Sequence, residues 1–560
     1  MGPKGIEMLK DREKQAWYGS LGRYFAKTSY EDEPLLDFAA ARRKLPEPIC
    51  SDRPDYVEGY WKAWEIAYRN AYVPNPASGF VSNFVDAAFN SSIFLWDTVF
   101  ITMFCNLGHP YIPGIRSLDN FYCKQFDDGE IPREIVRDTG EPFDRWLNWR
   151  RKPLHSYFHN HYRYRGLFAI DPPDYEEMHK PDLGRTVEEP PYLTLDALNH
   201  PLPAWAELES LRHTGDTGRL KLVWEPLYRY YRALHHHLRN RFGLFVTDWA
   251  SMDNSPRNRY LGSGVDISCE MALFARQLTE MAEILAQLHE REGDGQRVRQ
   301  LREAQAELTE DARNISAAVN EYMWDPASGF YYDVMEDGRR APVKTIAAYW
   351  ALLSGVADEA QAASLVRWLE NPAAFARKHR VPTLAADEEG YQPAGGYWQG
   401  AVWAPTNTMV VRGLEKYGYH RLARNIAVEH LDRVTQVFRE TGTFWENYAA
   451  DVVAQGDKGK PDFVGWSGIG PILFLLEHAI GLKGDALRNE LRWRLNPALG
   501  ESGCRRYWFN GRTVDLRAVP ESDGFEVSAE SDGPLTLRIE HGGREVSVDL
   551  LPGELCKVHL

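Results

Sequence analysis

Apolar residues recur three and four positions apart through most of the chain between residues 60 and 490. This spacing puts them on one face of a helix and therefore predicts amphipathic α-helices. The predicted helices cover residues 204–214, 219–240, 266–293, 298–323, 360–368, 405–417, 420–439 and 468–482. Alternation typical of strands is scarce here, so the pattern predicts a large, mainly helical body.

The pattern changes near residue 500, where apolar and polar residues begin to alternate in short runs. The runs cover residues 505–509, 513–518, 525–529, 535–540, 545–550 and 555–560. Between them lie Asn-Gly at 510–511, Ser-Asp-Gly at 522–524 and 531–533, and Gly-Gly at 542–543, which are signals for hairpin turns. The end of the chain is therefore predicted to be a small all-β appendage.

Three units follow from these patterns. We expect an N-terminal arm over residues 1–60 that packs on the main domain, a helical domain over residues 61–495 and a small β domain over residues 500–560. Consecutive helix pairs, joined by loops rich in Gly, Pro, Trp and Asp, favour an α/α toroid. A superhelical repeat is the alternative, but no fixed period of roughly 30–50 residues supports it.

Composition narrows the function classes. The chain has 560 residues with 65 basic and 80 acidic side chains, and its hydrophobic fraction of 44% suits a large core. A net charge of −15 argues against binding nucleic acid or an anionic membrane, because both need a basic surface. The 18 Trp and 28 Tyr exceed what a core requires, since their polar ends need partners, and favour an aromatic cleft with polar walls.

The N-terminal residues contain no apolar segment of the kind found in secretory signals, and no run of about 18 apolar residues occurs. The six cysteines are scattered without a Cys-x-x-Cys pair, which is unlike a disulfide scaffold or a zinc site. His235, His236 and His237 are adjacent in a predicted helix and point in different directions, so they do not predict a metal site. We expect a cytoplasmic protein without a metal or an organic cofactor.

The segment 395–407 is the richest in candidate binding residues. Glycines flank Tyr397, Trp398, Gln399 and Trp403, and Pro405 opens a predicted helix. Flat apolar rings beside amide and hydroxyl groups suit a sugar, which has an apolar C–H face and a rim of hydroxyls. The structural alternative is an aromatic loop that only packs on helix ends.

Two loop carboxylates are candidates for acid–base chemistry. Glu446 lies between Trp445 and Tyr448, where desolvation and hydrogen bonds can shift its pKa. Asp253 lies between two predicted helices in an Asp-Asn-Ser-Pro segment. The alternatives are a helix cap or an arginine partner for Glu446, and an Asx turn for Asp253.

Two earlier segments add further sugar-binding candidates. Trp96 beside Asp97 pairs a stacking face with a hydroxyl acceptor, and Gln125 and Arg133 add amide and guanidinium donors. Arg257, like Arg133, is a candidate partner for a carboxylate, either on a charged aglycone or on Asp253.

Taken together, seven segments in this order resemble the inverting α-glycosidases with an (α/α)6 barrel, which include glycoside hydrolase family 63, with its mannosylglycerate and glucosylglycerate hydrolases, and the family 37 trehalases. The segments are Trp96-Asp-Thr-Val-Phe100, Gln125-Phe-Asp-Asp-Gly-Glu-Ile-Pro-Arg-Glu134, Asn199-His-Pro-Leu-Pro-Ala-Trp-Ala-Glu207, Ser251-Met-Asp-Asn-Ser-Pro-Arg257, Gly395-Gly-Tyr-Trp-Gln-Gly-Ala-Val-Trp403, Trp445-Glu-Asn-Tyr448 and Phe463-Val-Gly-Trp-Ser-Gly-Ile-Gly-Pro471. The trehalase signature Pro-Asn-Gly-Gly-Arg is absent, and Ala401 stands where relatives often have Pro.

The resemblance implies a mainly α-helical (α/α)6 barrel that hydrolyses an α-linked glucoside or mannoside, most typically as an α-glucosidase. Asp253 corresponds to the general acid and Glu446 to the general base that activates water. Inverting hydrolases hold these two groups roughly 6.5–9.5 Å apart. The expected substrate-binding side chains are Trp96, Asp97, Gln125, Arg133, Trp249, Arg257, Tyr397, Trp398, Gln399, Trp403, Trp445, Tyr448 and Trp466.

Two rival functions remain open on the residues alone. A sugar epimerase or isomerase on the same toroid would use histidines, and His155, His159 and His161 are candidates. A non-catalytic carbohydrate-binding protein would keep the aromatic walls without the chemistry. A homo-oligomer is also compatible with the sequence, as are several sugars, linkages and aglycones.

Overall fold

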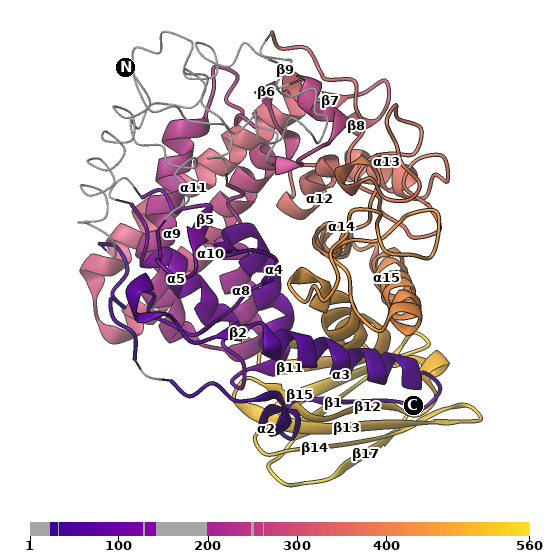
Figure 1. The fold of residues 1–560 in the computed structure, drawn as a ribbon. Coiled ribbons are helices and arrows are strands. Elements are labelled where there is room, and N and C mark those ends of the chain that lie inside the picture. Colours follow the sequence, from indigo (N-terminus) through magenta and orange to yellow (C-terminus); the bar gives the residue numbers. More distant parts are fainter. Residues whose placement is uncertain are drawn as a thin grey trace.

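The computed structural model describes residues 23–31, 33–126, 129–141, 199–247, 251–260, 262–335 and 337–560. Helices dominate this part of the chain up to residue 480, and two β-sheets follow (Figure 1). The α-helices are α2 (Phe38–Arg42), α3 (Pro54–Arg69), α4 (Leu95–Cys105), α5 (Asp119–Tyr122), α8 (Pro203–Thr214), α9 (Thr217–Leu238), α10 (Val265–Glu292), α11 (Gly295–Tyr322), α12 (Trp350–Ser354), α13 (Glu359–Leu369), α14 (Ala404–Lys416) and α15 (His420–Thr441). Shorter or wider helical turns include η10 (Tyr397–Gln399), η11 (Trp466–Ile469) and the π-helical η12 (Gly470–Ile480).

The inner helices follow one another in a closed order of neighbours. Helix α4 packs against α8, α8 against α10, α10 against α12, α12 against α14 and α14 against η11, which returns to α4. Helices α9 and α11 pack on α10, while α15 packs on α14 and η12, and α3 packs on η12. Figure 1 shows α4, α8, α10, α12 and α14 around the middle of the helical body.

Seven of the eight predicted helices are confirmed as α-helices, and the eighth, at residues 468–482, is mainly the π-helical η12. In α11, the buried side chains Leu301, Ala304, Leu308, Ala312, Ile315 and Val319 are three or four positions apart. The Asp294 carboxylate accepts a hydrogen bond from the Arg297 amide at 3.0 Å and caps the start of this helix. Gly293, with φ of +78°, ends α10 just before it.

Helix α4 was not among the predicted helices. All of its residues except Trp96 are buried, so it has no polar face from which a helical period could be recognised. Helix α3 begins at Pro54 and therefore crosses the boundary expected at residue 60.

The β region consists of two sheets. The five-stranded sheet has the antiparallel order β1 (Glu47–Cys50), β12 (Ser502–Phe509), β13 (Arg512–Glu521), β14 (Gly524–Ser531) and β17 (Cys556–His559). The four-stranded sheet has the order β10 (Leu482–Asp485), β11 (Glu490–Arg494), β15 (Leu535–His541) and β16 (Arg544–Leu550). Two-stranded pairs within the helical body are β2 (Ala71–Tyr72) with β3 (Phe84–Val85), β4 (Ser92–Phe94) with β5 (Glu134–Val136), β6 (Gly262–Ser263) with β9 (Val334–Met335), and β7 (Trp324–Asp325) with β8 (Phe330–Tyr331).

Three of the four predicted turn signals join hairpins. Asn510 and Gly511 connect β12 to β13 with φ of +49° and +75°, and Gly542 and Gly543 connect β15 to β16. The prediction is wrong for the second Ser-Asp-Gly, because it carries the chain from β14 in one sheet to β15 in the other. Turn chemistry specifies a reversal of the chain but not which strand the next segment pairs with.

The β region also extends beyond the range expected for it. Strand β10 begins at Leu482, so residues assigned to the helical domain contribute two strands to the four-stranded sheet. Strand β1 comes from the N-terminal arm and pairs with β12, with Glu47 opposite Arg505. The N-terminal segment therefore contacts the sheet as well as the helices.

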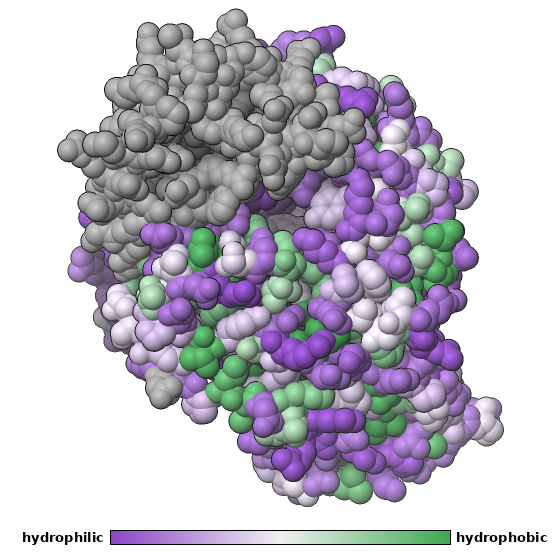
Figure 2. All heavy atoms as spheres, viewed as in Figure 1, coloured by the Kyte–Doolittle hydropathy of each residue, from purple (hydrophilic) through white to green (hydrophobic). Residues whose placement is uncertain are grey.

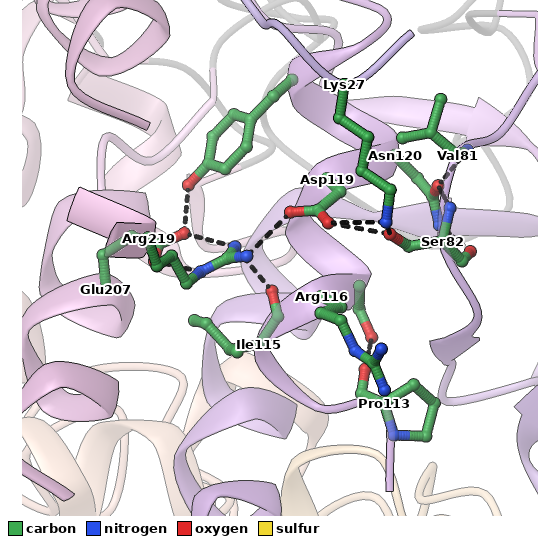
Figure 3. Close-up of polar contacts among 12 residues, drawn as sticks. Lys27, Val81, Ser82, Pro113, Ile115, Arg116, Asp119, Asn120, Glu207 and Arg219 are labelled. Atoms are coloured by element: carbon green, nitrogen blue, oxygen red, sulfur yellow. Dashed lines mark hydrogen bonds and ion pairs between the residues drawn. The ribbon is translucent and has the colours of Figure 1, made fainter. Parts of the chain in front are cut away.

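A buried ion network ties the N-terminal part of the body together (Figure 3). Arg219 on α9 lies between two carboxylates, with its Nε 2.6 Å from Glu207 and its Nη1 3.0 Å from Asp119. Lys27 lies 3.7 Å from the other oxygen of Asp119, and the Tyr122 hydroxyl donates to Glu207 at 2.9 Å. Glu207 of the predicted motif is thus a structural residue.

On the face shown in Figure 2, the described residues are mainly hydrophilic, with apolar residues in small groups. Within the described ranges, no helix combines the length and the apolar character needed to cross a membrane. All six cysteines are free thiols, and five of them are buried.

Candidate active site

The predicted aromatic residues form one continuous cluster where several helices begin. Trp96 lies in the first turn of α4, Trp403 precedes α14 and Trp466 opens η11. The Trp96 ring is 5.3 Å from that of Trp466 and 6.2 Å from that of Trp398, and Trp398 stacks on Trp403 at 4.7 Å. Segments far apart in the sequence thus build a single tryptophan wall.

Tyr397 belongs to the same cluster, with its ring 4.8 Å from that of Trp403. Its backbone has φ of +64°, a conformation that is uncommon outside glycine, and it follows Gly396 at φ of +59°. This tight turn directs the Tyr397 hydroxyl to Glu446, where it donates a hydrogen bond to Oε1 at 3.0 Å.

Glu446 is held on every side. Glu446 is only 2% exposed, and its Oε2 accepts a hydrogen bond from the Lys460 amide at 3.2 Å. The Glu446 amide donates to the Lys460 carbonyl, and the Trp466 indole donates to the Glu446 carbonyl at 2.8 Å. Burial raises the pKa of Glu446 to about 6, although Lys460 and the Tyr397 hydroxyl oppose the rise.

Asp253 is positioned by its neighbours on the loop. Asn254 accepts a hydrogen bond from the Trp398 amide at 2.9 Å and donates to the Gly396 carbonyl at 3.0 Å, which joins this loop to the aromatic one. The Asn258 amide donates to the carbonyl of Asp253. Burial raises the pKa of Asp253 to about 6, and the positive charge of Arg133 counteracts part of the rise.

The two candidate carboxylates share one electrostatic environment. The negative charge of Asp253 contributes to the raised pKa of Glu446. Lys460 acts on both groups, because its charge lowers the pKa of each. The structure therefore brings together the two residues that the sequence singled out for acid–base chemistry.

Asp97 and Trp96 present polar atoms to this region. Among the residues that the structure describes, Asp97 Oδ1 and Trp96 Nε1 are buried and have no hydrogen-bond partner. Burial, followed by the charges of Asp86 and Glu446, raises the pKa of Asp97 well above its usual value. Orphaned polar atoms of this kind beside aromatic rings match a site that binds hydroxyl groups.

Two expected contact residues, Gln125 and Arg257, have partners inside the protein. Gln125 is fully buried, and its amide donates to the carbonyls of Gly129 and Pro226 at 2.7 and 2.8 Å. Arg257 is 2% exposed and its guanidinium pairs with Asp266 at 2.7 Å. Gln125 Oε1 and Arg257 Nε nevertheless have no hydrogen-bond partner among the described residues, so a contact of these two side chains with substrate stays a prediction.

The other expected residues divide by exposure. Trp403, a member of the wall, and Tyr448 are almost fully buried, and the Tyr448 hydroxyl accepts from the Trp445 amide at 3.1 Å. Trp445 is partly exposed, but its indole donates to Thr441 at the end of α15. Gln399 is partly exposed, and its side chain accepts from that of Gln392. Trp249 and the three histidines His155, His159 and His161 lie outside the described residues.

Sequence reasoning missed a supporting network under Asp253. His200 is bound through Nδ1 to both oxygens of Glu270 at 2.8 and 2.9 Å, and its Nε2 lies 3.2 Å from the Ser251 hydroxyl. Burial opposes a charge on His200, but Glu270 outweighs it and raises the pKa of this imidazole. The Ser251 hydroxyl also donates to Asp266 at 2.6 Å. His200 belongs to the Asn199-His-Pro segment, one of the seven motifs, so its place in that motif could have marked it as a candidate site residue.

Comparison with known protein families indicates the class of enzyme that this chain resembles. Residues 193–463 match the model of the mannosylglycerate hydrolase MGH1-like glycoside hydrolase domain, a stretch that contains both Asp253 and Glu446. This part of the chain is similar to a glycoside hydrolase domain, and the resemblance inferred from the seven motifs is confirmed.

Several known proteins are similar to this chain in sequence. An uncharacterized protein of Borreliella burgdorferi is 23% identical over 60% of this chain and 70% of its own length. The mannosylglycerate hydrolase of Thermus thermophilus is 31% identical over 20% of this chain and 26% of its own length. A cytosolic neutral trehalase of Neurospora crassa is 27% identical over 27% of this chain, which is 21% of the trehalase.

The fold agrees with this grouping. The crystal structure of the family 63 mannosylglycerate hydrolase from Thermus thermophilus superposes with a TM-score of 0.52 at 19% identity, over 74% of this chain and 98% of that one. At this identity the superposition speaks for the fold alone. The chain therefore has mannosylglycerate hydrolases and trehalases as relatives and a family 63 enzyme as a structural neighbour.

Proposed function

We propose that this protein hydrolyses an α-linked glucoside or mannoside with inversion of the anomeric configuration. Asp253 donates a proton to the glycosidic oxygen, and Glu446 removes a proton from the water that attacks the anomeric carbon. The observation that carries the proposal is the pairing of two carboxyl groups, each with a pKa of about 6, beside one tryptophan wall.

The hydrogen bonds favour this division of roles. An inverting hydrolase needs one protonated and one ionised carboxyl group. Glu446 accepts two hydrogen bonds, from the Tyr397 hydroxyl and the Lys460 amide, and both stabilise its ionised form. When the pair holds a single proton, Glu446 keeps the charge of a base and Asp253 keeps the proton of an acid.

The wall supplies the sugar site in this proposal. Trp96, Trp398 and Trp466 offer flat faces for the apolar side of a pyranose ring. The unpartnered Trp96 indole can donate to a sugar hydroxyl. Asp97 Oδ1, which has no partner among the described residues, can accept a hydrogen bond from a second hydroxyl, and burial raises the pKa of this carboxyl.

The relatives support a specific first substrate. Two of them are named mannosylglycerate hydrolases, which makes mannosylglycerate the first compound to test, followed by glucosylglycerate and trehalose. The positive charge of Arg133 near Asp253 is compatible with an acidic aglycone. We also propose that the closed order of α4, α8, α10, α12, α14 and η11–η12 is an (α/α)6 barrel, which the family 63 neighbour supports.

A proton-NMR time course on the purified protein tests the function. We expect the β-anomer to be released first from at least one of these α-glycosides. Asp253→Asn and Glu446→Gln should each lower kcat by about 10²–10⁴-fold, the usual contribution of an acid or base. Glu440→Gln and Asp523→Asn make the same changes at exposed positions and should leave the rate unchanged.

Three outcomes contradict the proposal in different ways. Initial release of the α-anomer excludes direct attack by water. A new sugar formed without bond cleavage indicates an epimerase. Binding of a sugar without turnover, unchanged in both variants, indicates a carbohydrate-binding protein.

A further inference from the structure

A cavity of about 570 Å³ lies between the helical body and the four-stranded sheet. This volume is typical of sites for small molecules. The residues that line it come from α8, α10, α12, α14, α15, η12, β10 and β11.

The cavity is separate from the candidate active site. Helix α14 begins at Ala404, next to Trp403 in the tryptophan wall, and ends at Lys416 in the cavity. Thirteen residues at 1.5 Å each place about 20 Å between the two ends. Neither candidate carboxylate and none of the wall residues lines this cavity.

The charge of the lining is unlike that of the chain. Eight of the lining residues are Lys or Arg and four are Glu, whereas the whole chain carries a net charge of −15. Some of these cations are neutralised in place, such as Arg212 by Glu280 at 2.7 Å and Lys483 by Glu415 at 2.6 Å. A cavity with surplus positive charge inside an acidic protein points to a negatively charged ligand.

Three of the cations have no carboxylate within ion-pair distance in the described part of the chain: Arg276, Lys416 and Arg424. A Cβ built on Gly355 would lie 2.8 Å from Lys416 Nζ and 3.5 Å from Arg276 Nη1, so these two cations converge on one point. Lys416 lines the cavity, and desolvation, followed by repulsion from Arg276, lowers its pKa to about 8.

Arg424 forms a second cationic centre beside Arg494, whose Nε is already paired with Glu540 at 2.9 Å, so Arg424 carries the uncompensated charge at this place. Burial and then the charge of Arg494 lower the pKa of Arg424. Its Nη2 is buried and has no hydrogen-bond partner within the described residues. Like-charged neighbours at two places in one cavity are stabilised when an anion binds between them.

Helix ends explain only part of this arrangement. Arg276 donates to the Ser354 carbonyl, Lys416 to that of Leu353 at 3.1 Å and Arg424 to that of His478 at 2.9 Å, at the ends of α12 and η12. Each helix end supplies a partial negative charge of only about one half. A lysine has three donors and an arginine five, so all three cations retain donors for a ligand.

We propose that this cavity binds a small organic molecule with at least two anionic groups of the phosphate or carboxylate class. One group is bound by Lys416 and Arg276, and the other by Arg424 with Arg494. The site is independent of the hydrolytic reaction, and its occupancy does not require turnover.

The test uses calorimetry and thermal unfolding of the full-length protein with citrate, pyrophosphate and inorganic phosphate, each compared with chloride at equal ionic strength. We expect citrate or pyrophosphate to bind with one molecule per chain and to raise the unfolding temperature above that in chloride. Lys416→Gln and Arg424→Gln should each weaken binding about tenfold or more, the value of one charge-assisted hydrogen bond. Arg313→Gln, an equal charge change on exposed α11, should retain the affinity.

The proposal is overturned if no probe binds better than chloride, or if both cavity variants keep the wild-type affinity. Should the glutamine variants fail to fold, labelling of the wild-type protein decides instead. Citrate or pyrophosphate should then protect Lys416 from acylation by several-fold relative to the exposed Lys557, as read by mass spectrometry. Equal labelling of both lysines with and without the anion also overturns the proposal.

Discussion

Replacing Tyr397 with phenylalanine should shift the acidic limb of the pH–rate profile. The Tyr397 hydroxyl donates to Glu446 Oε1 at 3.0 Å and stabilises the ionised carboxylate. Without this bond the pKa of Glu446 rises from about 6, because the neutral acid loses less than the anion does. The phenylalanine ring keeps its place against Trp403, and the Lys460 amide still holds the other oxygen.

The size of the effect follows from the hydrogen bond. A bond to a charged group contributes about 1.5–3 kcal/mol, and one pKa unit corresponds to about 1.4 kcal/mol. A rise of about one unit takes the pKa of Glu446 to about 7. At pH 6 the ionised fraction then falls from about one half to about one tenth, so kcat/KM falls about fivefold. At pH 8 the carboxylate is ionised in both proteins, and the rates nearly agree.

The assay is kcat/KM between pH 4.5 and 9 on the substrate found by NMR. Tyr391→Phe is the matched control, because its hydroxyl donates to Asp451 at 3.0 Å in the same loop and touches neither candidate carboxylate. The control should keep the wild-type profile, and the alkaline limb should be the same in all three proteins. An acidic limb of Tyr397→Phe that coincides with the wild type, or a shift confined to the alkaline limb, would refute the assignment of Glu446 as the base.

Three further predictions concern stability. Arg219→Met leaves two buried carboxylates without their main partner and should lower the free energy of unfolding by about 3–5 kcal/mol. Arg229→Met removes one residue of an exposed ion pair on the same helix and should lower it by less than about 1 kcal/mol. Equal losses for the two variants in urea titrations would contradict the role of the buried network. Gly413→Ala places a Cβ 2.8 Å from the Leu352 side chain and should lower the free energy of unfolding by about 1–3 kcal/mol. Gly295→Ala brings its Cβ no closer than 3.8 Å to another atom and should leave the stability unchanged or raise it. The unfolding temperature of Gly413→Ala should therefore be the lower of the two. Burial lowers the pKa of His213 to about 3, so below about pH 6.5 the unfolded chain binds more protons than the folded one, and the free energy of unfolding decreases as the pH falls towards 3. His213→Phe should reduce this dependence by up to about 1.4 kcal/mol per pH unit. A dependence that is the same in the variant between pH 6 and 4 would contradict the prediction.

The long amphipathic helices could be predicted because each has one apolar and one polar face. Helix α11 shows this in its regular row of buried residues from Leu301 to Val319. Helix α4 could not be predicted in the same way, since nearly every residue from Leu95 to Cys105 is buried and the periodic contrast disappears. The three true hairpins were predictable from their turns, whereas the change of sheet after Ser531 depends on packing between distant strands.

The candidate site was predictable where a residue's chemistry and its motif agreed, as for Glu446 and the tryptophans. Gln125 shows the limit, because a polar residue in a motif can equally spend its hydrogen bonds on the backbone. Asn254 and the pair of His200 with Glu270 were missed because their partners are distant in sequence. The spacing of residues in the sequence does not tell whether a polar side chain binds substrate or forms hydrogen bonds within the protein.

The pairing of β1 with β12 has a consequence for the order of folding. Glu47 emerges from the ribosome hundreds of residues before its partner Arg505, so the five-stranded sheet cannot be completed until almost the whole chain has been synthesised. Until then β1 is an unpaired strand, and a chain that lacked residues 47–50 would leave β12 as an open edge to which another molecule could add. Removing β1 should therefore cause aggregation during expression, although β1 is separated in the sequence by about 450 residues from the strand with which it pairs.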